Sequence, residues 1–286
     1  MHRTIIHKFT LPAAVLAVAF AVFAGNTMAQ TGIIYGVRDL GNRFVVSSLD
    51  LTDQGLAAEL LTGNQPAKER IRDLFLMPDD RLALLRTNVV RNAKQNRSNI
   101  EILEDTPEGL RQRPADTVRI KEIPEMQAAS TVTRSNIGGT QSLITLLSHF
   151  TDTPPYSLGT IDLTTGQVTT LPFQLPEQAR FANLTQCPEG ITYATSLGIQ
   201  GGGTRLVRME LALGSFTEVA KLSLEGKSLR DDLKSLTCSA SGELFALGDP
   251  TYRGINALFQ VDPSTGDLTF IRVFDVDLIT SSSAVR

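Results

Sequence analysis

An eleven-residue phrase occurs twice in this chain, one hundred residues apart, and it restricts the fold more than any other feature of the sequence. Residues 161–171 read IDLTTGQVTTL, and residues 261–271 read VDPSTGDLTFI. In each copy an acidic residue precedes a cluster of turn-forming residues, and an apolar residue stands six places after the acid. Thr, Ser, Pro and Gly between two alternating segments favour a tight hairpin. The phrase therefore predicts two short strands joined by a turn.

The same spacing of acid and apolar residue recurs along the chain. The copies are Asp50/Leu56, Glu104/Leu110, Asp162/Val168, Glu210/Phe216 and Asp262/Leu268, and their acids lie 54, 58, 48 and 52 residues apart. An alternating segment, a turn and an apolar strand precede each hairpin, most clearly in residues 236–249 (LTCSASGELFALGD). Each unit therefore supplies four strands. Repeats of this length built from four-stranded units indicate a β-propeller.

The first unit lacks its innermost strand, and the end of the chain supplies a replacement. Residues 32–39 (GIIYGVRD) match residues 242–249 (GELFALGD), but no strand precedes them, whereas residues 279–285 (ITSSSAV) resemble the start of a unit. Pairing the two chain ends would close the ring and hide two exposed sheet edges. We expect an all-β propeller of five four-stranded blades, with six blades as the alternative if the spacing of 58 residues conceals an irregular blade.

The turns at residues 162–166 and 262–266 have the form D-x-x-T-G and resemble those of quinoprotein-type propeller repeats. This resemblance implies a propeller over essentially the whole mature chain. In that family a tryptophan normally follows the turn and docks one blade on the next. Here Thr169 and Thr269 lie beyond the turns and the chain contains no Trp, so the resemblance does not extend to a quinone cofactor.

The first 29 residues have the pattern of a secretory signal peptide. Arg3 and Lys8 provide a basic start, Leu11–Gly25 an apolar stretch, and Thr27–Ala29 a small-residue cleavage site. The apolar stretch is shorter than the roughly 20 residues that a membrane-spanning helix needs. We therefore expect residues 1–29 to be a cleaved signal, residues 30–286 to be one propeller domain, and the mature protein to be secreted or periplasmic with no stable membrane insertion.

Charge and residue inventory exclude several classes of function. Cleavage removes two of the 27 basic residues and none of the 30 acidic ones, which leaves a net charge of −5 and no general attraction for nucleic acid. His149 is the one histidine of the mature chain, and the two cysteines form no zinc-binding pattern. The glycine cluster at 198–204 is not followed by the lysine and helix of a phosphate-binding loop. We expect no metal, no cofactor and a monomer.

The two cysteines are predicted to form a disulfide. Aligning Gly190 with Gly242 places Cys187 opposite Ser239 and Cys238 one residue earlier in the repeat. Successive strand residues point to opposite faces, and the forward face of one blade meets the backward face of the next. The offset of one residue therefore directs both sulfurs into the same gap between blades. An oxidising compartment would preserve a Cys187–Cys238 bridge; the alternative is two buried thiols.

The predicted inner strands contain few groups for catalysis. Glycosidases need two carboxylates at the reaction centre, whereas residues 279–285, 73–78, 130–136, 183–190 and 236–242 are lined mainly by Ser, Thr, Asn and Gln. Their carboxylates, Asp73 and Glu189, lie at strand ends and form no evident pair. This pattern disfavours a glycosidase.

Four loops between second and third strands are predicted to lie on one face of the ring, at residues 87–99, 149–157, 198–205 and 248–256. Basic and aromatic residues of these loops are candidates for binding a ligand or partner. They are Arg91, Lys94, Arg97, Tyr156, Tyr252 and Arg253.

These features lead to two hypotheses about function. The leading one is an exported, non-enzymatic binding module whose loop face recognises an unknown protein, peptide or glycan. The alternative is a hydrolase or lactonase-like enzyme with a carboxylate or metal site near the propeller axis. Asp39 and Asp249, at the ends of equivalent strands, are the carboxylates that we would then expect to take part.

Overall fold

The computed structural model describes residues 32–53, 55–66, 68–88, 97–121, 123, 127–137, 140–149, 154–197, 202–230 and 233–282. The chain divides into two units, 1–30 and 31–286, and the predicted signal peptide lies outside the described residues. Every regular element of the described part is a β-strand. None of these residues belongs to a helix long and apolar enough to cross a membrane.

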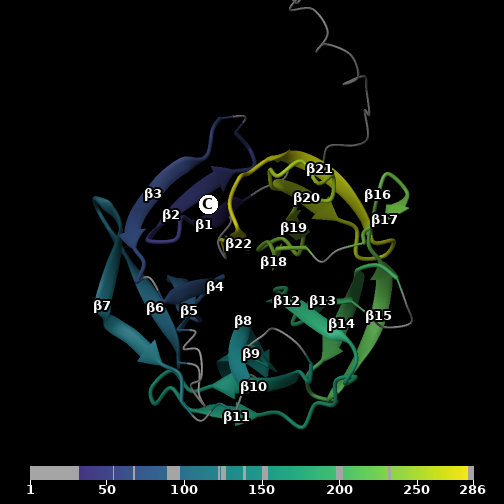
Figure 1. Ribbon diagram of the computed structural model, residues 1–286, viewed down its shortest axis with the longest axis horizontal. Helices are drawn as coiled ribbons and strands as arrows, with labels where there is room; N and C mark the ends of the chain where they lie inside the picture. The colour runs from purple at the N-terminus through teal and green to yellow at the C-terminus, as the bar shows by residue number, and fades with distance from the viewer. Residues whose placement is uncertain are drawn as a thin grey trace, which may run out of the picture. The chain divides into compact units, whose positions relative to one another are not determined.

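The strands form five antiparallel sheets arranged as blades around an axis (Figure 1). Blade 1 contains β22 (Leu278–Ser281), β1 (Ile33–Asp39), β2 (Arg43–Asp50) and β3 (Ala58–Asn64). Blade 2 contains β4 (Glu69–Leu76), β5 (Leu82–Asn88), β6 (Arg97–Thr106) and β7 (Gly109–Arg119). Blade 3 contains β8 (Gln127–Ile137), β9 (Thr140–His149), β10 (Ser157–Ile161) and β11 (Val168–Thr170).

Blade 4 contains β12 (Arg180–Gln186), β13 (Thr192–Leu197), β14 (Arg205–Glu210) and β15 (Ser215–Lys221). Blade 5 contains β18 (Ser235–Cys238), β19 (Leu244–Gly248), β20 (Ala257–Val261) and β21 (Asp267–Val273). A short hairpin, β16 (Ser223–Leu224) and β17 (Lys227–Ser228), precedes blade 5 and pairs in parallel with β21. The prediction of five blades is confirmed for the described part of the chain, and the alternative of six is wrong.

The C-terminal strand closes the ring, as predicted. β22 pairs antiparallel with β1 from Val37 opposite Leu278 to Ile34 opposite Ser281. Gly36 makes this closure possible, because an added Cβ would lie 2.7 Å from Cζ of Phe274 and 2.8 Å from Cγ2 of Val276. The two ends of the propeller domain are therefore joined by backbone hydrogen bonds and by close packing on a residue without a side chain.

Each gap between neighbouring blades in the described structure holds its own cluster of buried apolar side chains. The second strand of blade 2, β5, has the sequence LALLRTN, which is apolar at its first four positions. Leu82 and Leu84 face blade 1, whereas Ala83 and Leu85 face blade 3, as expected when successive residues point to opposite faces. Both faces of a blade are thus buried, and each fully buried Leu contributes about 2 kcal/mol through removal from water.

The repeated eleven-residue phrase forms the outer hairpins of blades 3 and 5. Their turns are closed by the Asp162 and Asp262 side chains, which accept hydrogen bonds from turn amides and hydroxyls. Beyond each turn, Gly166 and Gly266 have φ of +72° and +80°. An added Cβ would overlap the carbonyl oxygen of Arg119 or Lys221, where the previous blade ends and the inter-blade segment begins. Each glycine carbonyl accepts a hydrogen bond from that segment, at 2.7 Å from the amide of Lys121 and 2.9 Å from that of Ser223. The phrase recurs because each copy docks one blade on the chain that leaves the previous blade.

The predicted disulfide is present. Cys187 and Cys238 are bonded, with their Cα atoms 5.1 Å apart, within the range of about 4.4 to 6.8 Å that a bridge requires. Cys187 directly follows β12 and Cys238 ends β18, and both sulfurs lie in the apolar cluster between blades 4 and 5. The bridge therefore links the innermost strands of neighbouring blades.

We predict that Gly266→Ala destabilises the protein more than Gly190→Ala. Both glycines have a positive φ, but the space around Gly190 is open, whereas Gly266 touches the backbone of the segment leaving blade 4. Gly190→Ala, the control, should lower the free energy of unfolding by about 1 kcal/mol through backbone strain alone. Gly266→Ala should lower it by about 3 kcal/mol because of the added steric overlap. Urea unfolding measures both values; equal costs would contradict the docking role of the turn.

We also predict that the double variant Cys187→Ser/Cys238→Ser loses up to about 4 kcal/mol of unfolding free energy. A closed loop of this length, with a sequence separation of 51 residues, restricts the unfolded chain by about that amount. Unfolding should be compared for the oxidised wild type, the reduced wild type and the double variant. The last two should agree, and an oxidised wild type no more stable than the double variant would disprove the stabilising effect.

Candidate functional site

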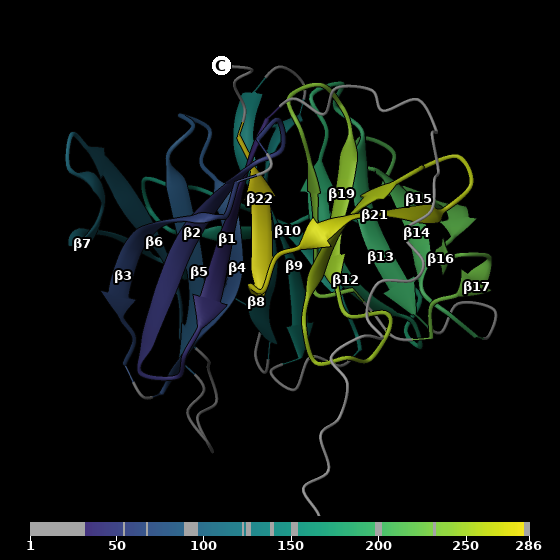
Figure 2. The same cartoon turned by 90° about the horizontal axis from the view of Figure 1, so that it is seen from above.

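A cavity of about 480 Å³ opens on the axis of the propeller, where the inner strands begin. The inner strands β4, β8, β12, β18 and β22 surround the axis in Figure 1, and Figure 2 shows β22 from the side, running along it. All five contribute to the lining, either directly or through the residues just before them. Second strands run antiparallel to inner strands, so the connections to third strands leave the sheets on this same face. We call this space the axial cavity.

Irregular pairing directs several side chains into the axial cavity. The register of β4 with β5 shifts between Ile71 and Asp73, that of β8 with β9 between Ala129 and Thr131, and that of β12 with β13 between Ala182 and Thr185. The residues inserted at these shifts include Arg72, Ser130 and Asn183, and all three line the cavity. β-Bulges re-aim side chains and are common next to active sites. Three inner strands therefore carry this irregularity at the same end of the ring.

Asp73 is the carboxylate of this cavity and is buried, with 7% of its surface exposed. Its Oδ2 accepts hydrogen bonds from Thr131 Oγ1 at 2.6 Å and from the Val132 amide at 2.7 Å, and its Oδ1 accepts one from the Leu74 amide at 2.9 Å. Burial raises the pKa of Asp73 to about 7, although these hydrogen bonds act in the opposite direction. Asp73 can therefore hold or release a proton near neutral pH.

The structural role of Asp73 does not require a carboxylate. In blade 5 the hydroxyl of Ser235 has the equivalent place: it accepts a hydrogen bond from the Ile279 amide of the neighbouring inner strand at 3.1 Å. The Thr237 hydroxyl likewise accepts a hydrogen bond from the Ser281 amide at 2.9 Å. A neutral hydroxyl thus links inner strands without the cost of burying a charge. The costlier group at position 73 points to a chemical function.

The remaining charged side chains of the axial cavity are cationic. They are Arg72, Arg180 and Lys234, and Asp73 is the one acidic residue among those that line it in the described structure. Lys234 pairs with the exposed Asp277, which lies outside the cavity, at 3.2 Å. A cavity with three cations and one carboxyl group favours anionic ligands.

The residues predicted to bind a partner have different positions. Arg91 and Lys94 lie outside the described residues, and Arg97 begins β6 with a side chain that is not described. Tyr252 and Arg253 are exposed, as predicted for the loop face. Their role in binding stays a prediction.

Tyr156 differs from the expectation of an exposed loop residue. It is buried between blades 3 and 4, where its ring packs edge-on against Phe181 with centroids 6.1 Å apart. The residue belongs to the core because the connection between β9 and β10 returns to the inter-blade gap before β10 begins.

The other candidate carboxylates stabilise turns. Asp39 accepts hydrogen bonds from the Gly41 amide and the Gln65 side chain, and Asp249 accepts them from the Arg253 and Gly254 amides. In the described part of the chain no three His, Cys, Asp or Glu residues form a group that could hold a metal ion.

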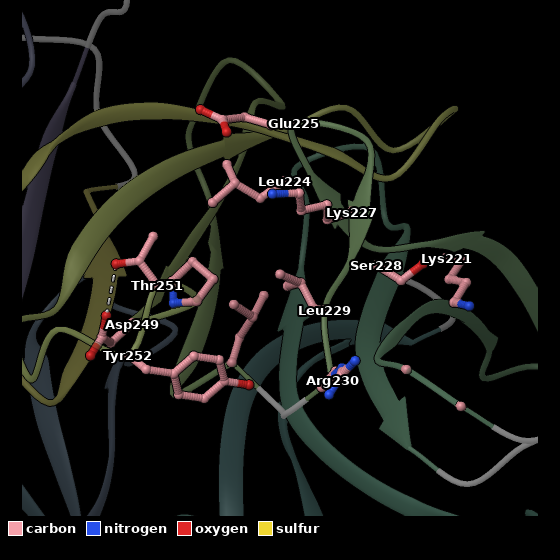
Figure 3. A pocket seen from close by; sticks show the side chains of 14 residues that line it. Lys221, Leu224, Glu225, Lys227, Ser228, Leu229, Arg230, Asp249, Thr251 and Tyr252 are labelled. Carbon is pink, nitrogen blue, oxygen red and sulfur yellow. Dashed lines mark hydrogen bonds between the residues drawn. The ribbon is translucent and has the colours of Figure 1, made fainter. Parts of the chain in front are cut away.

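A second and larger cavity, of about 740 Å³, lies between the β16–β17 hairpin and the connection from β19 to β20 (Figure 3). We call it the hairpin cavity. Tyr252 lies on its wall, and Leu233 lines both this cavity and the axial one. The two cavities are therefore neighbours.

Comparisons with known proteins identify the fold. No family model and no curated protein matches the chain. A protein of unknown function from Bacteroides caccae is 11% identical, with a TM-score of 0.52 over 89% of this chain and 100% of the other. A GH43 β-1,3-galactosidase in complex with galactodeoxynojirimycin is 10% identical, with a TM-score of 0.50 over 82% of this chain and 92% of the other. At these identities the likeness establishes a β-propeller and does not transfer a reaction.

The leading hypothesis of a non-enzymatic binding module is corrected by these comparisons. The galactosidase, a solved propeller of stated activity, is an enzyme. The sequence argument against an enzyme depended on the lack of a convergent carboxylate pair. It named Asp73 but did not anticipate that burial raises the pKa of this carboxyl group to about 7.

We predict that Asp73 makes the stability of the protein depend on pH between about 4 and 8. The pKa of Asp73 is about 7 in the folded state and has the ordinary, lower value of an aspartate in the unfolded chain. Between these two pKa values the unfolded chain releases the proton that the folded protein retains, so the free energy of unfolding falls as pH rises to about 7 and is constant above it. Relative to Asp73→Asn, the wild type should lose about 4 kcal/mol of unfolding free energy over this range. Denaturant unfolding at several pH values measures the difference, and parallel curves would show an ordinary pKa.

Proposed function

We propose that the protein is a hydrolase that cleaves an ester bond, including that of a lactone, in a polyhydroxylated and negatively charged substrate. The axial cavity is the reaction site and Asp73 is the general base. The observation that carries this proposal is the buried carboxyl group of Asp73. It has a pKa of about 7 and lines a cavity that also has three cationic side chains. A general base works best when its pKa is close to the operating pH.

The proposed reaction needs one proton acceptor. Each carboxylate oxygen can accept more than one hydrogen bond, and within the described structure Oδ1 of Asp73 accepts one, from the Leu74 amide. A water molecule held by Oδ1 transfers a proton to Asp73 while its oxygen attacks the carbonyl carbon. The alkoxide that leaves then takes this proton, so Asp73 returns to its ionised form and the products are an acid and an alcohol.

Cationic side chains support this chemistry by stabilising negative charge. Attack on the carbonyl group creates an oxyanion, and preorganised donors in a site that excludes water are the most effective stabilisers of such a charge. Lys234 and Arg72 are the proposed donors, because both line the cavity, Lys234 directly before β18 and Arg72 within β4. Arg180 is proposed to hold a carboxylate or similar group of the substrate, which an arginine binds through two parallel hydrogen bonds.

An ester is favoured over a glycoside because of the carboxyl inventory. Hydrolysis of a glycosidic bond uses two carboxyl groups on opposite sides of the bond. Among the described residues that line the axial cavity, Asp73 alone has one. The galactosidase with the same fold acts on galactosides, and this supports a sugar-derived substrate for the present chain without requiring the same bond.

We further propose that the enzyme is exported to the periplasm or the extracellular medium. The disulfide between blades 4 and 5 supports this location, since such bonds persist in oxidising compartments. The signal-like pattern of residues 1–29 is the sequence argument for the same location.

The test is a survey of lactones and esters of aldonic and uronic acids by pH-stat titration. We expect kcat/KM for the best substrate to rise with pH through about 7, because the ionised form of Asp73 is the active one. Asp73→Ser should fold, since Ser235 makes the equivalent link between inner strands, and it should lose about 100-fold or more in kcat. Asp79→Asn, which removes an exposed carboxylate at the far end of the same blade, is the matched control and should retain activity.

Three results would overturn the proposal. One is activity in Asp73→Ser equal to that of the wild type. Another is a rate that falls as pH rises through neutrality. The third is the absence of turnover of any of these esters by folded wild-type protein.

A further inference from the structure

The hairpin cavity is built from a segment that the repeat itself does not require. The β16–β17 hairpin is an insertion between blades 4 and 5, and residues 224–230 form one side of the cavity while residues 249–252 form the other. Gly203 completes the wall. Its φ is +98°, and an added Cβ would lie 2.8 Å from the Leu229 carbonyl oxygen and 2.9 Å from Cε of Lys221. The backbone thus packs closely around this space.

The side chains that face the cavity favour negative charge. Lys221, Lys227 and Arg230 are exposed cations on its lining. Of the two acidic residues, Glu225 lies at the rim on the side away from Tyr252 and Arg230 (Figure 3).

The second acid, Asp249, is occupied by its own turn. Its Oδ1 accepts hydrogen bonds from the Arg253 amide and the Thr251 hydroxyl, and its Oδ2 accepts one from the Gly254 amide at 2.6 Å. Although partial burial opposes it, this set of donors keeps the pKa of Asp249 below its usual range. The carboxylate is therefore satisfied by the backbone, and the cations remain to meet a ligand.

Tyr252 has a backbone conformation that favours glycine. Its φ is +55°, which is costly for a bulky side chain, and the residue is 64% exposed. The backbone strain at position 252 thus falls on a residue whose side chain is accessible to a ligand. Figure 3 shows the Tyr252 ring and the Arg230 guanidinium directed toward one another across the cavity. The position thus presents a flat apolar surface beside a cationic group.

We propose that the hairpin cavity is a binding site for an acidic sugar unit that carries a carboxylate or a sulfate. The sugar ring packs against the face of Tyr252, and its anionic group binds Arg230 and Lys221. Tyr and Arg are among the residues enriched at the energetic hot spots of protein interfaces. The site is separate from the axial cavity across Leu233, and it holds its ligand whether or not the axial cavity is catalytic.

The experiment is isothermal titration of the folded protein with trigalacturonate and with N-acetylgalactosamine 4-sulfate, using the corresponding neutral sugars and AMP as comparisons. We expect one acidic sugar to bind, with an affinity that falls as salt is added. Tyr252→Ala and Arg230→Gln should each weaken binding by about tenfold or more. Tyr252→Phe, which retains the ring, should bind, as should Arg111→Gln, the control for an exposed arginine on blade 2.

Two further variants separate binding from other roles. Tyr252→Gly relieves the backbone strain, so its melting temperature should rise while binding is lost; a lower melting temperature would mean that the ring is structural. Asp73→Ser should bind as the wild type does, even if hydrolysis is absent. Equal affinity for neutral sugars, preferential binding of AMP, or no saturation by either acidic probe up to about 10 mM would overturn the proposal.

Discussion

Four residues at each end of the propeller domain, Ile34–Val37 and Leu278–Ser281, pair as antiparallel strands and convert an open row of blades into a ring. Without this pairing β1 would be an unpaired sheet edge of blade 1, and the two terminal blades would each expose half of an apolar cluster. The cluster between blades 5 and 1 contains Phe274 and Val276, which pack on Gly36 at the same joint. The axial cavity exists only because the ring is closed, since its lining comes from the inner strands of all five blades.

Closure brings five inner strands so near one another that their polar side chains must bond across the gaps. Hydroxyl groups meet this need at low cost, as Ser235 and Thr237 do in blade 5. Asp73 meets the same need with a carboxyl group. Burial disfavours its ionisation and raises its pKa to about 7, so both protonation states are populated near neutral pH. Fold and chemistry are thus connected at one position: the hydrogen bonds that hold blade 2 to blade 3 also fix the orientation of the proposed base.

The blades, their closure and the disulfide could be predicted from the sequence because each depends on a local pattern repeated along the chain. Turn residues at fixed spacing define the outer hairpins, and one aligned register defines which cysteines meet. The axial site could not be predicted in the same way. Arg72, Ser130 and Asn183 reach the cavity through shifts in strand register that no alternation of residues reveals. Asp73 was noticed at a strand end, but its pKa depends on burial in the assembled ring. A carboxylate on an inner strand, where blade 5 has the hydroxyl of Ser235, was the available signal.

The disulfide also determines what happens when the backbone is cut. Cys187 and Cys238 enclose most of blade 4, the β16–β17 hairpin and the start of blade 5. A protease that cleaves once anywhere between these cysteines produces two chains that stay covalently joined beside the axis. The same two chains are held a second time by β1 and β22, one strand from each piece. A single cut in this stretch therefore gives two fragments on a reducing, denaturing gel. In the native ring, the disulfide and the β1–β22 pairing still hold these fragments together.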